Sequence, residues 1–595
     1  MNRQNNSVGI VETKTVRVVD AQSPLTLDCG RELSPIDVSY ETYGRMNESG
    51  DNVVYICHAL TGNAHVAGYN SPDDKKPGWW DDFVGPGKYI DTDKYFVVCS
   101  NFLGGCSGTT GPTSINPSNG EPYALNFPVY TIGDMVRVQK LFLEKIGVNH
   151  LLAVIGGSMG GMHALKWAIE YPDFMDAAVV VASTSRLSPQ AIAFDAVGRN
   201  AILADRDFQD GKYTNDKGPE RGLGIARMIG HITYLSEKGM REKFGRELRT
   251  AQDYTYDFNP EFSVETYLNH QGQSFVERFD ANCYLYITKA MDYFDLGREY
   301  GSLEAAFKKI KAKLLIVSFS SDWLFTPEQS VDMVNAVVAN NKSVSYCNIE
   351  SPYGHDAFLL EPDTLGPLIG GFLASSFESH VSPFDPESID YADLQESAKR
   401  VRVDYEIIED VIEPGSRVLD AGCGNGDLLY RLSRDKNASV EGIEVRQDLV
   451  IKCISKGIPV IHKDIENGLD CYRDKSFDYG VLSQTVQTLK EPEYVFRELL
   501  RVAKRVIVSF PNFAYWKVRL SLMLKGQAPV TPELPFEWYN SPNIHFLSIK
   551  DFEQFCSKIG VVIEKKVPLR GSSPSTIKPA PNFFAPQAIY LVRKD

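Results

Sequence analysis

Short apolar segments rich in valine, isoleucine and tyrosine alternate with longer amphipathic segments in two separate series along this chain. The first series runs from about residue 50 to 180, through NVVYICHAL, KYFVVCSNF, LLAVIGG and DAAVVVAS. The second begins at GSRVLDAGCGNGDLLYRL and continues through ASVEGIEV, FDYGVLSQ and RVIVSFPN. Such alternation predicts largely parallel sheets covered by helices. The length of 595 residues exceeds what one hydrophobic core organises and indicates two or three domains, and the two series place two α/β domains in the chain.

A polar stretch with two prolines, FESHVSPFDPESIDYADLQESAKR (377–400), separates the two series. We predict a first domain at 1–380, a linker at 381–400 and a second domain at 401–595. Within the first domain the strand pattern fades between about 185 and 300, where GLGIARMIGHITYLSEKGMREKF carries apolar residues at helical spacing. We therefore expect a helical insertion before strands resume at KLLIVSFSSD and SVSYCNIES.

Composition excludes several classes of protein. A formal charge of -15 argues against a broad nucleic-acid surface, which needs clustered lysine and arginine. The ten cysteines are scattered without the spacing of zinc ligands or of a secreted disulfide framework, so we expect no metal site. The first residues lack the apolar core of a signal peptide, and no apolar run is long enough to span a bilayer. We predict a cytoplasmic protein with no nucleic-acid or membrane partner.

The motif Gly156-Gly157-Ser158-Met159-Gly160 fits G-x-S-x-G and lies between a predicted strand and a predicted helix. In α/β-hydrolases such a turn lifts the serine into an exposed position, although glycines at a strand-helix turn also serve close packing alone. The hydrolase order requires an acid and then a histidine, each just after a late strand. Asp322 ends KLLIVSFSSD, and His355 in SPYGHDAF follows the next strand. We predict a triad of Ser158, Asp322 and His355.

An oxyanion needs two backbone donors in such a site. We expect the first from Met159, after the serine, and the second from Leu60 in ICHALTGNAH, although HALTG also fits an ordinary glycine turn. The glycine-rich stretch NFLGGCSGTTGP (101–112) lacks the lysine of a phosphate-binding loop, so we interpret it as a structural loop near the site. Cys106 within it has no matched histidine and is not expected to act as a nucleophile.

These motifs, together with GLGIARMIGHITYLS (222–236) and SSDWLFTP, resemble the homoserine O-acetyltransferases of the MetX family, enzymes of methionine biosynthesis. The resemblance implies an α/β-hydrolase fold with a helical lid, and a homodimer. It implies that Ser158 is the nucleophile, His355 the base and Asp322 its orienter, while Arg227 and Asp356 bind the acceptor. An amino-acid acceptor carries a carboxylate for a guanidinium and an ammonium for a carboxylate. The implied reaction moves an acetyl group from acetyl-CoA to the hydroxyl of L-homoserine through an acyl-enzyme, giving O-acetyl-L-homoserine and CoA.

The acyl donor is predicted from one position. Succinyl-using members of the family resemble one another in having arginine two positions after the catalytic acid, where this sequence has Leu324. An apolar side chain cannot pair with a distal carboxylate, so we favour acetyl-CoA. The alternatives are a homoserine O-succinyltransferase and an ester hydrolase with an accessory methyltransferase domain.

The second series carries a nucleotide-type motif, RVLDAGCGNGDLLYRL, between a strand and a helix. Its glycines let a cofactor approach the backbone at a helix N-terminus. The segment resembles class I S-adenosylmethionine-dependent methyltransferases, with a Rossmann-like fold, and about residues 400–595 resemble the MetW proteins. The cofactor-binding residues predicted there are Asp420, Gly422, Gly424, Gly426, Glu444 and Asp464.

Three interpretations of this second domain stay open. It transfers methyl groups to an acceptor that the sequence does not identify, it binds S-adenosylmethionine without catalysis, or its glycines serve packing only. As a hypothesis, a domain that binds S-adenosylmethionine could tune or support the first domain.

Overall fold

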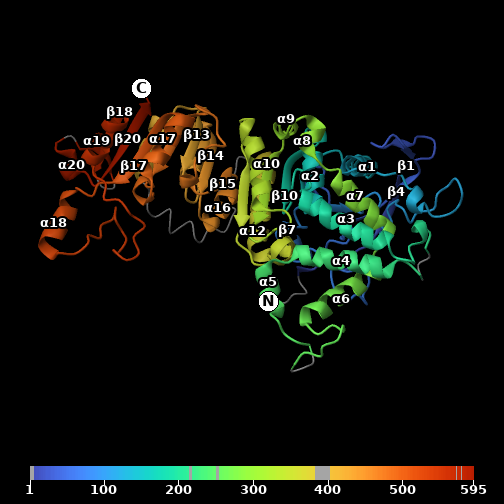
Figure 1. Ribbon diagram of the computed structural model, residues 1–595. Coiled ribbons are helices and arrows are strands. Elements are labelled where there is room, and N and C mark those ends of the chain that lie inside the picture. The colour runs from blue at the N-terminus through green and yellow to red at the C-terminus, as the bar shows by residue number, and fades with distance from the viewer. Residues whose placement is uncertain are drawn as a thin grey trace. The chain divides into compact units, whose positions relative to one another are not determined.

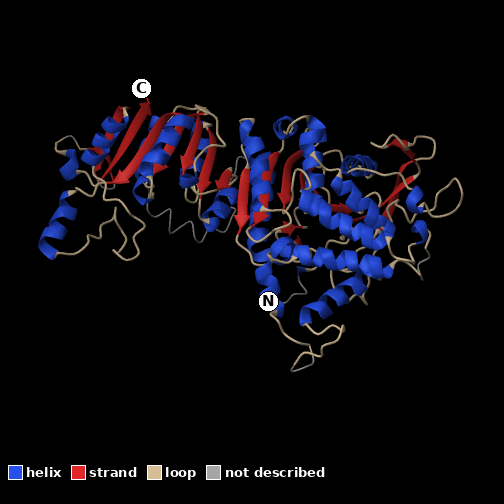
Figure 2. Cartoon of the chain, viewed as in Figure 1, coloured by secondary structure: helices blue, strands red, loops and turns tan. Residues whose placement is uncertain are grey.

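A computed structural model of the chain describes residues 6–213, 217–249, 253–381, 403–570, 573–577 and 579–594. It divides into two compact units, Met1–Asn340 with Asn348–His380, and Asn341–Cys347 with Val381–Asp595. Each unit is a sheet flanked by helices, which confirms the predicted α/β class (Figures 1 and 2). The predicted linker, 381–400, lies outside the described residues except at its first position.

The sheet of the first unit is parallel in its middle and antiparallel at one edge. Its strands follow the order β1-β4-β8-β5-β9-β10-β11-β12, with β1 antiparallel to β4, β4 antiparallel to β8, and parallel pairing from β8 through β11. The bounds are β1 Lys14–Val19, β4 Ile36–Tyr43, β5 Val53–Cys57, β8 Phe96–Ser100, β9 Leu151–Gly157, β10 Met175–Val181, β11 Lys313–Phe319 and β12 Ser345–Ile349. The division between the two units falls within β12.

The central strands form where the sequence is continuously apolar. Every residue of β5 and β9 is buried, as expected for parallel strands covered on both faces. Helices α1 (Ile132–Lys145), α2 (Met159–Glu170), α10 (Pro327–Ala339) and α12 (Pro362–Val381) accompany this sheet. Helix α1 begins at a capping box in which Thr131 and Asp134 satisfy each other's backbone amides. Two short strand pairs, β2 Leu25–Thr26 with β3 Glu32–Leu33 and β6 Val84–Gly85 with β7 Ile90–Asp91, lie outside the main sheet.

Helices fill the chain between β10 and β11. They are α3 Pro189–Leu203, α4 Glu220–Tyr234, α5 Glu237–Phe244, α6 Ser263–Val276, α7 Ala281–Asp292, α8 Leu296–Tyr300 and α9 Leu303–Lys308. Helix α4 packs against both α3 and α6, and α3 also contacts α7, so these four helices form one layer, seen at the right of Figure 1. We call the segment from α3 to α7 the helical insertion. The short turn Gly354–Asp356 and helix α11 (Ala357–Leu360) follow β12, and α4 contacts that turn.

The second unit has the strand order β15-β14-β13-β16-β17-β20-β18-β19. Strands β15 to β17 pair in parallel, while β20 lies antiparallel to both β17 and β18. The bounds are β13 Arg417–Ala421, β14 Ser439–Glu444, β15 Val460–His462, β16 Phe477–Ser483, β17 Ala503–Pro511, β18 Val561–Arg570, β19 Ser573–Thr576 and β20 Gln587–Lys594. The order reverses at β13, where α/β sheets of this type bind nucleotides.

Helices complete the second unit: α14 Val403–Val411, α15 Asp427–Lys436, α16 Gln447–Ser455, α17 Pro492–Val502, α18 Trp516–Lys525, α19 Ile549–Ile559 and α20 Pro581–Phe584. None of the helices in the described ranges has the length and apolar character that a bilayer crossing requires. Within the same ranges, no three His, Cys, Asp or Glu side chains are grouped so that they could hold a metal ion.

Candidate active site

Ser158 lies on a strained turn between β9 and α2, with φ 58° and ψ -124°. A non-glycine residue in this region costs about 1–3 kcal/mol, so the surrounding backbone must hold it there. A Cβ on Gly156 would lie 1.9 Å from the carbonyl oxygen of Gly160, and a Cβ on Gly160 would lie 2.1 Å from that of Cys57. The Ser158 amide also donates to the carbonyl of Val181 at 2.9 Å. The glycines of the motif are therefore sterically required by this turn.

Ser158, His355 and Asp322 form a buried hydrogen-bonded chain. His355 Nε2 lies 2.8 Å from Ser158 Oγ, and His355 Nδ1 lies 2.7 Å from Asp322 Oδ2. The other Asp322 oxygen, Oδ1, accepts the amides of Leu324 and Phe325 at 3.0 Å each. Because a carboxylate only accepts, Nδ1 carries the proton and Nε2 is free to accept from the serine hydroxyl. This arrangement is that of a nucleophile, a base and the group that orients the base.

The charge state of His355 is set by opposing effects. Burial alone would lower its pKa, but the charge of Asp322, the hydrogen bond to it and the charge of Asp356 together raise the pKa above its ordinary value. Only neutral imidazole takes a proton from serine. His355 is therefore able to accept the proton of Ser158 only at pH values above this raised pKa.

The two predicted oxyanion donors lie at the ends of neighbouring strands. Met159 is the first residue of α2, and the first amides of a helix have no partner within it. Leu60 follows β5 in a turn where Gly62 N donates to Ala59 O at 2.9 Å and His58 Nδ1 donates to the same oxygen at 2.8 Å. Because β5 and β9 are adjacent and parallel, both residues lie at the same edge of the sheet.

Two arginines of the helical insertion hold the residue after Leu60. Arg227 Nη1 donates to the hydroxyl of Thr61 at 3.3 Å, and Arg278 Nη1 donates to the Thr61 carbonyl at 3.1 Å. Both guanidinium groups lie over the ring of Phe275, 4.8 Å and 5.2 Å from its centroid. Sequence reasoning named Arg227 but missed Thr61, Arg278 and Phe275. The Arg278 contact spans 217 positions of sequence, so no local pattern could have predicted it.

Asp356 lies next to His355 in the chain, and its charge acts on both His355 and Arg227. Among the described residues no hydrogen bond to its carboxylate is found, and burial raises its pKa although the charges of His355 and Arg227 lower it. The ring of Tyr234 lies 5.8 Å from the His355 ring and 5.8 Å from the Arg227 guanidinium, measured between centres. A guanidinium and a carboxylate thus flank the triad on its α4 side.

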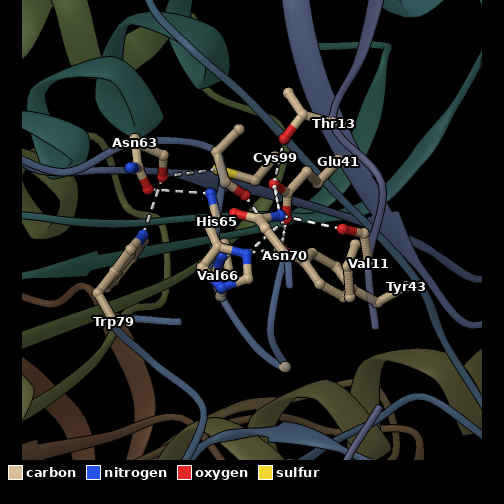
Figure 3. A network of polar contacts seen from close by, with 12 residues as sticks. Val11, Thr13, Glu41, Tyr43, Asn63, His65, Val66, Asn70, Trp79 and Cys99 are labelled. Carbon is tan, nitrogen blue, oxygen red and sulfur yellow. Dashed lines mark hydrogen bonds and ion pairs between the residues drawn. The ribbon is translucent and has the colours of Figure 1, made fainter. Parts of the chain in front are cut away.

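A buried carboxylate supports the chain that follows the oxyanion loop. Figure 3 shows Glu41 of β4 at the centre of a network with Thr13, Tyr43, His65 and Asn70. Its oxygens accept from the hydroxyls of Thr13 and Tyr43 at 2.7 Å each, from Asn70 Nδ2 at 2.9 Å and from His65 Nδ1 at 2.9 Å. Burial alone would raise the pKa of Glu41, but hydrogen bonds from His65, Thr13 and Asn70 keep it below its ordinary value. The network ties the segment after Leu60 to the sheet edge.

Three other histidines of the first unit have packing or hydrogen-bonding roles. His58 and His163 stack on opposite sides of Phe102, with centroids 3.6 Å and 4.2 Å from that ring, and burial lowers their pKa values to about 4 and about 3. His231 Nδ1 lies 3.1 Å from the Tyr267 hydroxyl, and burial with nearby cations lowers its pKa to about 3. None of these three contacts Ser158 among the described residues.

The predicted glycine loop of the second unit connects β13 to α15. Gly422, Gly424 and Gly426 have φ values of 86°, 60° and 79°, a region that favours glycine. A Cβ on Gly424 would meet nothing within 4 Å, whereas one on Gly422 would lie 2.8 Å from Thr485 Oγ1. The loop therefore has open space beside Gly424, whereas Gly422 is packed against Thr485.

The predicted acidic residues Asp420 and Glu444 of this unit adjoin the same loop. Asp420 is buried within β13. The carboxylate of Glu444, at the end of β14, accepts from Gly424 N at 2.9 Å and from Val445 N and Arg446 N at 3.0 Å and 2.9 Å. Asp464 caps the short turn Ile465–Asn467. An open glycine backbone beside a carboxylate on the next strand fits the ribose-bearing cofactors bound by such folds.

Comparison with known proteins identifies relatives of both units. The family described as alpha/beta hydrolase fold matches residues 52–362, and that described as methionine biosynthesis protein MetW matches residues 402–592. The bifunctional methionine biosynthesis protein MetXA/MetW of Rhodopirellula baltica is 42% identical over 93% of this chain and 88% of its own length. The chain belongs to the MetXA/MetW family. The family resemblance predicted from the motifs is thereby confirmed.

The chain also has relatives that cover about two thirds of its length. The homoserine O-acetyltransferase of Methanosalsum zhilinae is 51% identical over 68% of this chain and 81% of its own length. The crystal structure of homoserine O-acetyltransferase from Bacillus anthracis superposes with a TM-score of 0.58 at 30% identity, covering 61% of this chain and 98% of that one. The α/β-hydrolase fold predicted for the first unit is confirmed.

Relatives with other stated activities cover a similar share of the chain. A homoserine O-succinyltransferase of Magnetococcus marinus is 50% identical over 63% of this chain and 96% of its own length. The crystal structure of esterase E22 has a TM-score of 0.57 at 30% identity, covering 61% of this chain and all of that one. Homoserine O-acetyltransferases at about 50% identity nevertheless support acetyl transfer to homoserine over these alternatives.

Proposed function

We propose that the first unit transfers an acetyl group from acetyl-CoA to the hydroxyl of L-homoserine, giving O-acetyl-L-homoserine and CoA. The observation that carries this proposal is the buried Ser158-His355-Asp322 chain with Arg227 and Asp356 beside it. An esterase that uses water needs no clamp for an amino acid. An acceptor with both a carboxylate and an ammonium group matches one guanidinium and one carboxylate.

The first half-reaction acylates the serine. His355 Nε2 takes the Ser158 proton, and the serine oxygen attacks the thioester carbonyl carbon. The amides of Leu60 and Met159 stabilise the resulting oxyanion. The carbon-sulfur bond then breaks, His355 returns its proton to the departing CoA sulfur, and an acetyl ester remains on Ser158.

The second half-reaction transfers the acetyl group. Arg227 binds the homoserine carboxylate and Asp356 its ammonium, which directs the side-chain hydroxyl toward His355. His355 removes the hydroxyl proton, the oxygen attacks the acetyl ester, and Ser158 leaves with that proton. Positioning of the acceptor must let it outcompete water, and the helical insertion serves as a lid that limits access of water to the ester.

Leu324 supports acetyl over succinyl transfer. It lies two residues after Asp322, and its amide donates to that carboxylate at 3.0 Å. A leucine side chain there offers no charge to a distal succinyl carboxylate. Succinyl-CoA is the alternative donor, because the relative from Magnetococcus marinus is named a homoserine O-succinyltransferase. Comparing the turnover of acetyl-CoA and succinyl-CoA tests this choice directly.

A thiol-release assay tests the proposed reaction. Purified full-length protein is mixed with acetyl-CoA and, in turn, homoserine, serine or no acceptor, while free CoA is measured. We expect rapid steady release only with homoserine, and none with Ser158→Ala. Release at the same rate without an acceptor would favour an ester or thioester hydrolase, and equal turnover of succinyl-CoA would overturn the assignment of the donor.

We propose that the second unit binds S-adenosylmethionine at the glycine loop. This group supplies an activated methyl for transfer to a nucleophile when it is bound. Glu444 would accept hydrogen bonds from its ribose, Gly424 would leave room for it, and Asp464 would lie toward its adenine. Binding measured by titration calorimetry tests this, and Glu444→Ala should weaken it. No binding would favour a supporting role without the cofactor.

We further propose how the whole chain is assembled and regulated. In keeping with the family resemblance, it is expected to be a homodimer, which sedimentation would test. The ten free cysteines support a cytoplasmic location.

If S-adenosylmethionine tunes the first unit, adding it should change the rate of homoserine acetylation by the full chain. An unchanged rate would reject this coupling.

A further inference from the structure

Leu60 and Thr61 are the middle residues of a turn that the Gly62 amide closes by donating to the Ala59 carbonyl at 2.9 Å. In the described part of the chain, neither the Leu60 amide nor the Thr61 amide donates to a protein oxygen. Leu60 is buried, and it lies at the same edge of the sheet as Ser158. A buried amide without a protein partner is available to the oxygen of a ligand.

Two peptide groups of this turn connect the Leu60 amide to Arg278. In a trans peptide group, the carbonyl of one residue and the amide of the next point in opposite directions. The Thr61 carbonyl accepts from Arg278 Nη1 at 3.1 Å, and the Gly62 amide of the same peptide group donates to the Ala59 carbonyl. The amide of that second peptide group belongs to Leu60. The hydrogen bonds therefore run in one direction, from the guanidinium to the Leu60 amide.

Arg278 is held by the turn between α6 and α7. Its amide donates to the Phe275 carbonyl at 3.1 Å, and its guanidinium lies 5.2 Å from the centre of the Phe275 ring. That ring is 1% exposed, and a cation is attracted to the face of an aromatic ring. No carboxylate among the described residues lies close enough to act on the charge of Arg278. The guanidinium therefore meets the Thr61 carbonyl without being neutralised.

A charged donor at one end of such a series strengthens the donor at the other end. Hydrogen bonds in series polarise one another, by about 10–30% per bond. Burial and the charge of Arg227 lower the pKa of Arg278, but a guanidinium remains charged in proteins. The same bonds hold both peptide groups at fixed angles, so the Leu60 amide keeps one direction.

We propose that Arg278 is a positioning residue for acyl transfer, which orients and polarises the Leu60 amide through two peptide groups. The oxygen of the attacked carbonyl becomes negative, and it accepts from that amide. Arg278 itself touches no reacting atom. Its role differs from that of Arg227, which donates to the hydroxyl of Thr61 and so lies outside the series. This inference rests on the proposed acyl transfer through Ser158.

The burst of p-nitrophenol from p-nitrophenyl acetate tests this role in the full-length protein. This ester requires only the nucleophile, its base and the oxyanion donors, so the burst reports acylation whatever the natural acceptor is. Loss of an oxyanion donor costs about 10²–10³-fold. Arg278 acts indirectly, and His58 also donates to the Ala59 carbonyl, so we expect Arg278→Met to slow the burst about tenfold. Arg246→Met is the matched control, because that guanidinium lies 5.3 Å from the Phe262 ring in the same insertion, and its burst should be unchanged.

Two further variants separate the charge of Arg278 from its shape. Arg278→Lys keeps a positive donor and should recover part of the rate, whereas Arg278→Gln keeps a neutral donor and should recover less. Thermal unfolding midpoints are measured for every variant. If Arg278→Met unfolds more readily, the comparison of the lysine and glutamine variants decides. A burst of Arg278→Met within about twofold of the unmodified protein, or equal rates for the other two variants, would overturn the proposal.

Steady-state acetyl transfer distinguishes this role from binding of the acceptor. Arg278→Met should lower kcat and leave the KM for homoserine unchanged, because an oxyanion forms in both half-reactions. A raised KM with an unchanged burst would mean that Arg278 binds homoserine, and would overturn the proposal. If the unmodified protein gives a burst with the ester but transfers no acetyl group to homoserine, the proposed function fails, and the burst still tests Arg278.

Discussion

Replacing Asp322 by asparagine tests the triad with little change of shape. Asp322 Oδ2 accepts from His355 Nδ1, while Oδ1 accepts two backbone amides at 3.0 Å each. Asparagine has one acceptor oxygen, and the two fixed amides hold it. Its amide group then faces Nδ1, which must become an acceptor, so the proton moves to Nε2. A histidine in that tautomer cannot take the proton of Ser158.

The expected loss of rate is large. In a serine protease triad, an aspartate-to-asparagine change that reverses the tautomer lowers kcat by about 10⁴-fold, which corresponds to about 5.5 kcal/mol. Coulomb's law gives a similar figure. Two unit charges 2.7 Å apart, the separation of Asp322 Oδ2 and His355 Nδ1, attract by about 6 kcal/mol at an effective dielectric constant of about 20. That attraction stabilises the imidazolium that forms when His355 takes the proton.

Rapid mixing with acetyl-CoA measures this step without an acceptor. The first turnover releases one CoA for each serine acylated, so its rate reports acylation alone. For Asp322→Asn we expect a fall of about 10⁴-fold with an unchanged thermal unfolding midpoint, and Ser158→Ala sets the background. A burst within about tenfold of the unmodified protein, at equal stability, would refute the tautomer argument.

Three further changes test other parts of the site. Asp356→Asn should move the acid limb of the kcat/KM profile to lower pH, because the Asp356 charge raises the pKa of His355 and only neutral histidine is a base; an unmoved limb would contradict this. Leu324→Arg should raise the kcat/KM ratio of succinyl-CoA to acetyl-CoA, and an unchanged ratio would remove Leu324 as the determinant. Gly156→Ala would place a Cβ 1.9 Å from Gly160 O and should lower the free energy of unfolding by about 3 kcal/mol in urea; a loss below about 1 kcal/mol would mean that the turn relaxes.

The triad could be predicted because its members follow strand ends in a fixed chain order. In a parallel sheet those ends share one edge, so Ser158, Asp322 and His355 needed no long-range information beyond the strand pattern. Arg278 and Thr61 could not be found in this way, because their contact depends on how the helical insertion packs. Their roles follow from tertiary structure alone.

The strands of the fold likewise divide into those that the sequence predicted and those that it did not. The central strands of both units were predictable because they are continuously apolar, as β9 illustrates with every residue buried. The strands β1 and β20 were missed. β1 is a mostly exposed edge strand, whereas β20 is an interior strand from the far end of the chain that pairs antiparallel with both β17 and β18. Edge strands lack the unbroken apolar signal. Glu444 was predicted to bind a cofactor. Its carboxylate also accepts a hydrogen bond from Gly424 of the glycine loop, a contact that the sequence pattern does not show.

The hydrogen bonds from Arg227 and Arg278 to Thr61 link the position of the helical insertion to the support of the proposed oxyanion donor. Both side chains belong to the helical insertion, whereas Thr61 belongs to the sheet edge that carries Leu60. An insertion that swung outward would withdraw both guanidinium groups from Thr61. The Leu60 amide, the proposed oxyanion donor, would then lose this support while bulk water could enter the site. Under the proposed mechanism, such an open site would stabilise the oxyanion less well, which would protect the acetyl ester from water until an amino acid is bound.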